Sequence, residues 1–581
     1  MGAEMKNLMK YFRGYGKEAL CAPFFKILEA AFELLVPFVV AAIIDRGVPS
    51  GDKVYIVKMC GVLVLLGTVG LATTLAAQYF AAKGAVGFCT NLRQALFDHI
   101  QSLGFSERDL LGSSSMITRL TSDINTVQSG LNMTLRLMMR SPIIVFGAMI
   151  MAFTIDFRSA LIFLVTIPVL TVIVVGITLF CIPLYDDVQK KLEKVLLSVK
   201  ENLVGARVIR AFCKEEQETE KFSQRNDSLC RRQKRVGKIS AAMNPLTFVI
   251  INLAIILLIY CGALEVESGA LTQGMVIALY NYMSQILVEL IKLANLIISI
   301  PKSLACAKRV SSVLSVRSEM QNGSDKTVDF GAEYALEYVG CGLRYSGAAE
   351  DSLENISFKL KQGETLGVIG PTGCGKSSLA ALAPRFYDCT SGEVRVYGKN
   401  VRDYDLDTLR GAIGFVFQKN RLFSGTVRDN LSFGAENADD GDMINALKSA
   451  QAWDFVSEKG GLDFEISQGS SNLSGGQTQR LCIARALVRK PKILILDDSS
   501  SALDYATEAR LRSAISKLEG SPAAVIVSQR VSTVMHCDRI LVLEDGRCEG
   551  LGTHDQLLKT CAEYREICES QLRASEGGAA S

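Results

Sequence analysis

Six apolar stretches in the first 300 residues restrict the fold of this chain more than any other feature. A helix that crosses a bilayer needs about 20 consecutive, mostly apolar residues. The six stretches lie near 20–44, 55–82, 136–156, 160–183, 246–266 and 275–299. Any one of them would fit a buried helix of a soluble protein. Six in succession, several with Gly or Pro inside, instead predict a membrane domain over 1–304.

The connections between these stretches alternate between short and long. Those after the second and fourth stretches run for about fifty residues, and 187–242 carries fourteen Lys and Arg. An excess of basic residues marks the cytoplasmic side of a membrane protein. We therefore expect a plasma-membrane protein with both termini in the cytoplasm. The segments SSSMITRLTSDINTVQ and ENLVGARVIRAFCKEE are the expected turns, where long helices meet a soluble part.

Polar residues recur along one face of the first and sixth predicted helices. Charged groups in hydrocarbon are costly, so they pair with one another or face a water-filled cavity. Their spacing of three or four residues places each set on one helical face. Both interpretations stay open, and we expect at least part of the stripe to line a cavity. The residues are Lys26, Glu29, Glu33, Asn281, Gln285, Glu289 and Lys292.

Composition separates this apolar half from a different second half. The hydrophobic content of 49% and the mean hydropathy of +0.24 are high, and the excess lies in the first 300 residues. After a polar connector over 305–333, short strands, turns and amphipathic helices predict an α/β domain over 334–570. The small, polar tail 571–581 is predicted to be disordered. The sixteen scattered cysteines lack paired metal-ligand spacing, and the net charge of +3 does not indicate a nucleic-acid partner.

A glycine-rich loop follows an apolar strand in the second half. The strand TLGVIG leads into GPTGCGKSS and then a helix rich in Ala and Leu, which is the setting that a phosphate-binding loop requires. We expect backbone N–H groups and Lys376 to hold the phosphates of ATP. Cys374 is interpreted as filler and not as a redox sensor. The predicted nucleotide-binding residues here are Gly370, Pro371, Thr372, Gly373, Cys374, Gly375, Lys376, Ser377 and Ser378.

A second apolar strand, ILILD, ends at Asp497. An aspartate in this place would hold Mg²⁺, through water, together with the hydroxyl of Ser377. The predicted cofactors are therefore ATP and Mg²⁺.

The sequence NLSGGQTQRLCIARAL, placed before the aspartate-ended strand, resembles the ATP-binding cassette of ABC transporters. The resemblance covers nearly the whole chain. Six spans with two long cytoplasmic connections are similar to the exporter-type fold, in which one half-transporter joins a membrane domain to a cassette. The implied fold is a membrane α-helical bundle followed by an α/β P-loop cassette with a helical subdomain.

The resemblance also implies roles for single residues. Tyr345 would stack on adenine, Gln418 would touch Mg²⁺ and the attacking water, and Asp504 would lie in the loop between paired cassettes. In this family two cassettes enclose each ATP, so the chain must pair with a second half-transporter. The segment SQGSSN departs from the family pattern and implies nothing specific. The signature residues, which would grip the partner's ATP, are Leu473, Ser474, Gly475, Gly476 and Gln477.

Two positions depart from the family pattern beside the expected γ-phosphate. Asp498 stands where the family has a catalytic glutamate, and Gln529 stands where it has a histidine. Together they predict a site that binds ATP and cleaves it slowly. We favour a heterodimer whose other site, completed by this chain's signature, is competent. A homodimer with two slow sites is the alternative.

The most favoured function is ATP-driven export of amphipathic drug-like or lipid-like molecules through the bilayer. Import through the same fold, or an ATP-gated regulator or channel with little hydrolysis, are the alternatives. The six predicted spans exclude a soluble cassette ATPase that acts on DNA or ribosomes.

Overall fold

The computed structural model describes residues 8–499, 503–518 and 520–578. The chain divides into two compact units. The membrane unit takes its described residues from Met1–Gln101 and Ser113–Val316, and the cassette unit takes its own from Ser102–Gly112 and Arg317–Ser581.

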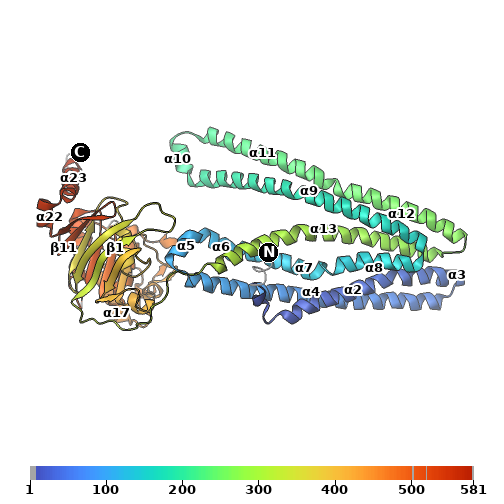
Figure 1. The fold of residues 1–581 in the computed structure, drawn as a ribbon, viewed down its shortest axis with the longest axis horizontal. Helices are drawn as coiled ribbons and strands as arrows, with labels where there is room; N and C mark the ends of the chain where they lie inside the picture. Colours follow the sequence, from blue (N-terminus) through green and yellow to red (C-terminus); the bar gives the residue numbers. More distant parts are fainter. Residues whose placement is uncertain (1–7, 500–502, 519, 579–581) are drawn as a thin grey trace. The chain divides into compact units, whose positions relative to one another are not determined.

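The membrane unit is a bundle of long helices (Figure 1). Within the described ranges, six helical stretches are long and apolar enough to cross a membrane, as the sequence predicted. They are Gly16–Ser50, Lys53–Ser102, Ser113–Ile155, Phe157–Val204, Glu215–Glu267 and Gln273–Ser315. The long helices are α2 (Gly16–Ala42), α4 (Lys53–Ser102), α7 (Ile124–Leu137), α8 (Arg140–Ile155), α9 (Phe157–Val204), α11 (Glu215–Ala241), α12 (Met243–Glu267) and α13 (Gln273–Ser315). Shorter elements are η1 (Lys10–Phe12), η2 (Ile43–Gly47), α3 (Val48–Ser50), α6 (Ser113–Thr118), η3 (Arg119–Asp123) and α10 (Ala206–Ala211).

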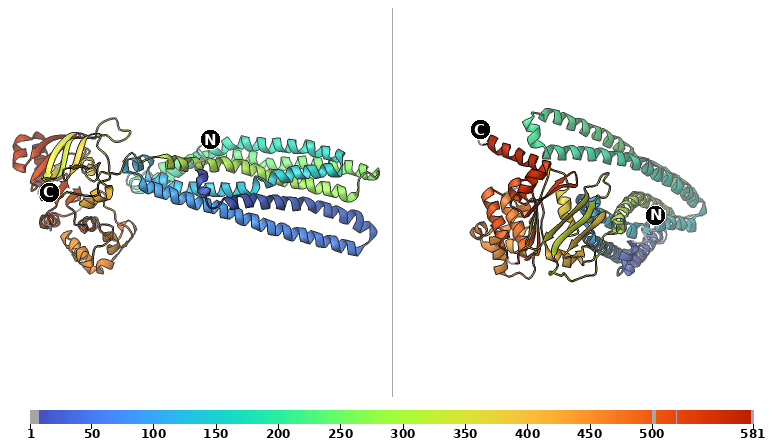
Figure 2. Two further views of the ribbon diagram at one scale, coloured as in Figure 1. Left: turned by 60° about the horizontal axis from the view of Figure 1, so that its bottom comes forward. Right: turned by 60° about the vertical axis from the view of Figure 1, so that its left-hand side comes forward.

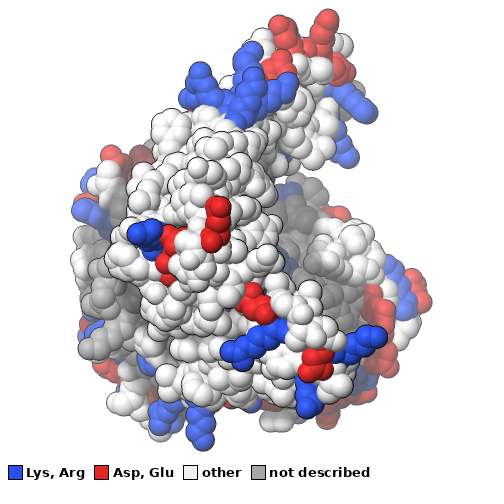
Figure 3. Space-filling view, turned by 90° about the vertical axis from the view of Figure 1, so that its right-hand side faces the viewer, with Lys and Arg blue, Asp and Glu red and all other residues white. Residues whose placement is uncertain are grey.

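The outer surface of the bundle is apolar. In α4, the side chains of Val64, Leu65 and Leu71 are all exposed. Water would not tolerate such a row, whereas lipid matches it. Figure 3 looks at the end of the bundle where α3 lies, and there uncharged side chains predominate over scattered acidic and basic ones.

The interior of the bundle is closed by residues from α2, α8, α9, α12 and α13. Phe163 of α9 and Tyr282 of α13 are fully buried among them. The Tyr282 hydroxyl donates a hydrogen bond to the carbonyl oxygen of Leu34 at 2.6 Å, so this polar group has a partner in the apolar interior.

The helices continue beyond their apolar parts, as expected from the sequence. Helix α9 ends at Val204, α10 forms the turn, and α11 returns beside α9 (Figure 2). The predicted turn in ENLVGARVIRAFCKEE is therefore confirmed. The other predicted turn was placed too late, because 113–128 is helical and belongs to the membrane unit. The turn is Ser102–Gly112, in which helix α5 (Phe105–Leu111) lies between Gly104 and Gly112.

Two sheets form the centre of the cassette unit in the part of the chain that the structure describes. One has the strand order β12-β11-β3-β10-β9-β6 and is parallel except for β12. The other is antiparallel, with the order β2-β1-β4-β5. The strands are β1 (Tyr334–Leu343), β2 (Leu353–Lys361), β3 (Thr365–Ile369), β4 (Ser391–Val396), β5 (Lys399–Asn400), β6 (Ile413–Val416), β7 (Gly425–Thr426), β8 (Glu465–Ile466), β9 (Ile493–Asp497), β10 (Ala523–Val527), β11 (Arg539–Glu544) and β12 (Arg547–Gly552).

Helices complete the cassette unit and include the helical subdomain that the sequence predicted. That subdomain contains α16 (Val427–Ser432), α17 (Asp440–Ser449), α18 (Trp453–Glu458) and α19 (Gly475–Leu487). The others are α14 (Lys376–Leu382), α15 (Leu406–Ala412), α20 (Tyr505–Ile515), α21 (Val531–Val534), α22 (His554–Thr560) and α23 (Ala562–Gly578), with short turns η4 (Gly461–Asp463) and η5 (Gln468–Ser470).

The predicted boundaries shift at two places. Helix α13 runs to Ser315, so the expected linker 305–333 begins as helix. The tail 571–581, predicted to be disordered, is helical as far as Gly578, and its last three residues lie outside the described residues.

Candidate functional site

Three neighbouring parallel strands bring the predicted nucleotide residues together. Strand β10 lies between β3 and β9, and Val527 is in register with both Val368 and Asp497. Because the strands are parallel, their carboxyl ends meet at one edge of the sheet, where ligands bind in open α/β sheets. The phosphate loop follows β3, Asp497 ends β9, and the segment with Gln529 follows β10.

The phosphate loop follows a path that only glycine allows at two places. A Cβ at Gly370 would lie 2.0 Å from the carbonyl oxygen of Leu543. At Gly375 the φ angle is +95°, and a Cβ would lie 2.5 Å from the carbonyl oxygen of Ser352. Side chains are therefore excluded here, and the backbone N–H groups are left to face a ligand.

The side chain of Lys376 points back into the phosphate loop. Its Nζ donates to the carbonyl oxygens of Gly370 at 2.7 Å and Pro371 at 2.6 Å. The ammonium is buried within the loop, and its predicted contact with the phosphates of ATP stays a prediction. Cys374 is buried next to it, and burial raises the pKa of the Cys374 thiol. A protonated, buried thiol fits the interpretation of Cys374 as filler.

Ser377 and Asp497, both predicted to hold Mg²⁺, meet in the structure. The Ser377 hydroxyl donates to Asp497 Oδ1 at 2.9 Å. Asp497 is buried, and that burial raises the pKa of its carboxyl. A hydroxyl and a buried carboxylate are hard oxygen ligands that suit Mg²⁺, so these residues fit the cofactor. When bound, Mg²⁺ would neutralise phosphate charge at this point.

Asp498 and Gln529 follow the neighbouring strands β9 and β10 at this edge of the sheet. Asp498 has a φ angle of +46°, and its backbone N–H donates to the carbonyl oxygen of Val527 at 3.0 Å. Its Oδ2 accepts from Nε2 of Gln418 at 3.4 Å, a long hydrogen bond. Gln529 Oε1 lies 3.5 Å from the Thr372 hydroxyl of the phosphate loop. Both departures from the family pattern therefore contact residues predicted to touch Mg²⁺ or phosphate.

Helix α23 contributes a residue that the sequence did not single out. Gln571 Nε2 donates to the carbonyl oxygen of Gln529 at 2.7 Å, and its Oε1 accepts from the N–H of Val531 at 2.9 Å. One amide thus clamps the backbone on both sides of Arg530. No sequence signal marks a glutamine near the end of a chain, so only the structure could find it.

Tyr345, predicted to stack on adenine, is joined to helix α5 through a second tyrosine. Its hydroxyl is 2.9 Å from the Ser378 hydroxyl, and its ring packs edge-on against Tyr387 at 5.0 Å between centroids. The Tyr387 hydroxyl donates to Asp109 Oδ2 of α5 at 2.5 Å. Helix α5 belongs to the cassette unit, so these contacts all lie within that unit.

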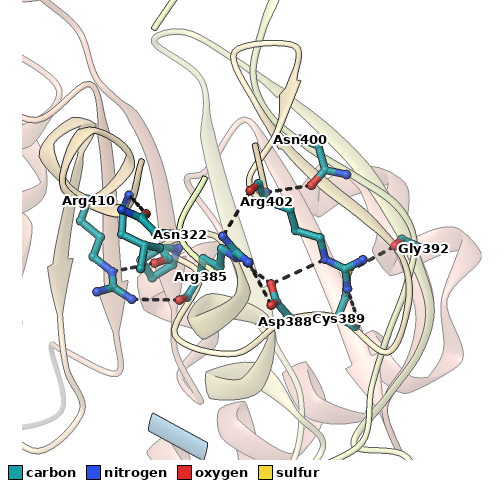
Figure 4. Close-up of polar contacts among 10 residues, drawn as sticks. Asn322, Arg385, Asp388, Cys389, Gly392, Asn400, Arg402 and Arg410 are labelled. Carbon is teal, nitrogen blue, oxygen red and sulfur yellow. Dashed lines mark hydrogen bonds and ion pairs between the residues drawn. The ribbon is translucent and has the colours of Figure 1, made fainter. Parts of the chain in front are cut away.

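The segment after α14 is held rigidly by arginines (Figure 4). Arg385 Nε donates to Asp388 Oδ1 at 2.8 Å, and Arg402 Nη2 donates to the Cys389 carbonyl oxygen at 2.6 Å. Arg410 Nη2 donates to the Arg385 carbonyl oxygen at 3.0 Å. These bonds fix the stretch that carries Phe386 and Tyr387.

Phe386 completes the contact with α5. Its ring lies 4.5 Å from that of Phe105 in α5 and stacks on Phe417, 5.4 Å away, next to Gln418. The sequence analysis did not single out Phe386, Tyr387 or Phe105.

The signature residues lie at the start of α19. Ser474 is the N-cap, and it forms a reciprocal capping box with Gln477. Ser474 and Gly475 are exposed, so the first N–H groups of a thirteen-residue helix face outward. Leu473 packs against the apolar core and Gly476 is partly exposed. A helix N-terminus of this kind favours an anion.

Asp504 caps the start of α20 and is exposed. A hydrogen bond from Thr507 lowers the pKa of its carboxyl. The neighbouring Ser501 and Ala502 of the SALD sequence lie outside the described residues.

The polar stripe of the membrane unit forms a connected charge cluster. Arg140 of α8, which the sequence did not single out, joins the first and sixth spans. Its guanidinium lies 2.8 Å from Glu33, 3.6 Å from Glu29 and 3.5 Å from Glu289. Lys26 pairs with Glu29 at 2.5 Å, and Lys292 pairs with Glu289 at 2.8 Å. Arg140, one of two arginines in the third apolar stretch, was the available signal.

The polar stripe combines ion pairs with a cavity, and Glu33, Glu289 and Lys292 take part in both. A cavity of about 460 Å³ is lined by Glu33, Asn281, Gln285, Glu289 and Lys292, among others. Glu29, also expected to line a cavity, is buried in ion pairs and does not line this one.

Comparisons with known proteins agree with this architecture. The family model of the ABC transporter transmembrane region matches residues 19–290, and that of the ABC transporter matches 353–501. An uncharacterized ABC transporter ATP-binding protein of Mycobacterium tuberculosis (strain ATCC 25618 / H37Rv) is 35% identical over 580 residues, covering 98% of this chain and 99% of the relative. An ATP-dependent lipid A-core flippase of Albidiferax ferrireducens is 30% identical over 574 residues, with 97% of each chain covered.

The fold is also similar to that of a solved structure. A bacterial Atm1-family ABC exporter with ATP bound has a TM-score of 0.80 at 22% identity, covering 96% of this chain and 99% of that chain. This chain therefore belongs to the ABC transporters, as a membrane-embedded polypeptide in which an exporter-type transmembrane region is fused to an ATP-binding cassette.

Proposed function

We propose that this chain is one subunit of a heterodimeric, ATP-driven exporter, and that the ATP site on its own phosphate loop hydrolyses slowly. One observation carries the proposal. The phosphate loop, the Ser377–Asp497 pair and the signature are complete, whereas Asp498 and Gln529 lie beside Gln418 and Thr372. Both departures are thus on the side where the γ-phosphate and the attacking water would sit.

The side chain of Asp498 is one methylene shorter than that of the catalytic glutamate that the family has at this position. Its carboxylate therefore lies ~1.5 Å, the length of one carbon–carbon bond, short of the position that a glutamate carboxylate would reach. Misplacing a catalytic group by about 1 Å costs on the order of a hundredfold in rate. Asp498 is anchored by its backbone bond to Val527, so the chain does not move forward to compensate.

Gln529 does not replace an imidazole. Its amide donates and accepts hydrogen bonds, but it neither carries a positive charge nor relays a proton. Gln571 fixes the backbone on both sides of Arg530, next to Gln529.

The signature residues of this chain would contact the ATP that is bound on the phosphate loop of the partner subunit. Gly475 offers a backbone N–H and Ser474 offers a hydroxyl, both on exposed residues, and these donors suit a γ-phosphate. The partner subunit is then expected to carry glutamate and histidine at the two altered positions. Closure of the two cassettes around ATP would reach the membrane helices through α5, whose Asp109 and Phe105 contact Tyr387 and Phe386.

The proposed cargo is an amphipathic small molecule, drug-like or lipid-like. The cavity between α2 and α13 supports this class because it joins charged residues to the apolar Val36, Val40 and Val288. The relative named as a lipid A-core flippase supports it as well. We place the protein in the cell membrane, with its cassette and both termini in the cytoplasm.

Purification of the full chain from native membranes, followed by reconstitution in vesicles, tests this function. We expect a second cassette subunit in equal amount, with glutamate and histidine at the altered positions. With ATP, and not with ADP, the vesicles should move a fluorescent amphiphile against its gradient. A preparation that contains this chain alone and pumps fully would contradict the heterodimer, and absence of ATP-driven movement of any amphiphile would contradict export.

A further inference from the structure

We propose that the cavity between α2 and α13 binds a zwitterionic head group, one that carries both a positive and a negative charge. The inference rests on the proposed transport of amphipathic molecules and names their class more narrowly. It comes from how the charges of the cluster are connected and which of them reach the cavity.

The charged groups form a chain of alternating sign. Glu33 Oε2 accepts from Arg140 Nη2 at 2.8 Å, and Arg140 Nη1 lies 3.5 Å from Glu289 Oε1. The same oxygen of Glu289 lies 2.8 Å from Lys292 Nζ. The chain thus begins with a carboxylate on α2 and ends with an ammonium on α13.

The full cluster carries no net charge. Its cations are Lys26, Arg140 and Lys292, and its anions are Glu29, Glu33 and Glu289. A group with a single charge would enter this environment without a free counter-charge, and burying an uncompensated charge is costly. A head group with one charge of each sign keeps the balance.

Glu33, Glu289 and Lys292 line the cavity, and the two ends of the chain, Glu33 and Lys292, are its most exposed members. The side chains of Glu33 and Lys292 are 37% and 36% exposed, whereas those of Arg140 and Glu289 are 13% and 3% exposed. The ammonium of Lys292 has three donors, so donors remain after its bond to Glu289. A positive group would therefore meet Glu33 and a negative group would meet Lys292.

The remaining lining of the cavity suits the rest of such a molecule. Gln285 Oε1 is buried and, among the described residues, has no hydrogen-bond partner, so it awaits a donor. Val36, Pro37, Val40 and Val288 provide an apolar wall. Polar and apolar parts of one amphiphile can thus be accommodated side by side.

Four amphiphiles with the same alkyl chain test the inference. Their head groups are phosphocholine, trimethylammonium, phosphate and maltoside. Equilibrium binding to the complex purified from native membranes is measured in lipid nanodiscs. We expect the phosphocholine compound to bind at least tenfold more tightly than each of the others. Equal binding of all four compounds, or tightest binding of the trimethylammonium, phosphate or maltoside compound, overturns the inference.

Two charge-neutralising variants sharpen the test. Glu33→Gln leaves the cluster with one excess positive charge, so tightest binding should shift to the phosphate compound. Lys292→Gln should shift it to the trimethylammonium compound. Arg158→Gln, in an exposed ion pair with Glu265 away from the cavity, should leave the ranking unchanged. If Glu33→Gln and Lys292→Gln keep the wild-type ranking of binding affinities, the two residues do not determine which head group binds.

Failure of this inference is distinguishable from failure of the proposed function. Transport of all amphiphiles regardless of head group would leave export standing and remove the zwitterion preference. Absence of any ATP-driven transport would remove export, whereas the binding measurements would still decide the head-group preference.

Discussion

Replacing Ser474 with arginine should lower ATP turnover of the assembled transporter at least a hundredfold, whereas Asp498→Asn should lower it less than twofold. Ser474 caps α19 and presents its hydroxyl beside exposed N–H groups, which we propose complete the competent site on the partner. Loss of one such donor toward developing charge typically costs about a hundredfold to a thousandfold in rate. In the proposed heterodimer, Asp498 belongs to the slow site, which would contribute little to total turnover.

Matched variants separate this effect from a general disturbance of the loop. Ser471→Arg adds the same positive charge to an exposed residue three positions earlier and should leave turnover nearly unchanged. Steady-state ATPase activity of the three variants, with thermal unfolding as a check of folding, provides the comparison. Equal losses from Ser474→Arg and Asp498→Asn would mean that both sites hydrolyse, and the asymmetric account would be wrong.

Replacing Arg140 with methionine should destabilise the membrane domain by about 3–5 kcal/mol, because it leaves buried carboxylates without their cation. Arg140 lies within 3.6 Å of Glu29, Glu33 and Glu289, which come from two different helices. Thermal unfolding in nanodiscs measures the effect. The double variant with Glu289→Met should recover part of the lost stability, because one unpaired charge is removed as well.

Arg158 offers a matched control for Arg140. It pairs with Glu265 at 2.8 Å, but its side chain is 80% exposed. Exposed ion pairs contribute about 0–1 kcal/mol, so Arg158→Met should change stability little. If Arg140→Met were as mild as Arg158→Met, the cluster would not hold α2, α8 and α13 together.

The sequence could predict that the candidate nucleotide residues lie together, because each belongs to a local strand-and-loop pattern. Each key residue follows a strand, and parallel strands bring their carboxyl ends together. Ser377 and Asp497, far apart in the chain, therefore meet at 2.9 Å as expected. Gln529 likewise lies next to Thr372, where the family pattern places its histidine.

Residues that act through long-range contacts could not be predicted in the same way. Arg140 meets its carboxylates only when three helices pack, and Gln571 reaches Gln529 from a helix at the end of the chain. The spacing of residues within one helix does not show which residues of other helices or loops they will contact. Tyr387 belongs to the same class, since its partner Asp109 lies in the membrane half of the sequence.

The misplaced turn has a simpler physical origin. The segment 113–128 is rich in small polar residues, which favour turns, yet it continues as helix in the membrane unit. The chain turns instead where Gly104 and Gly112 flank α5, and Gly112 has a φ angle of +72°. The two glycines that flank α5 were therefore a better signal for the turn than the polarity of 113–128.

The central claim is that this chain binds ATP on its own phosphate loop without being equipped to split it quickly. The most direct test is the ATP turnover of the chain assembled only with copies of itself, compared with the double variant Asp498→Glu, Gln529→His. We predict slow turnover for the natural chain and a rise of about a hundredfold or more in the double variant. Equal, fast turnover of the two proteins would contradict the claim.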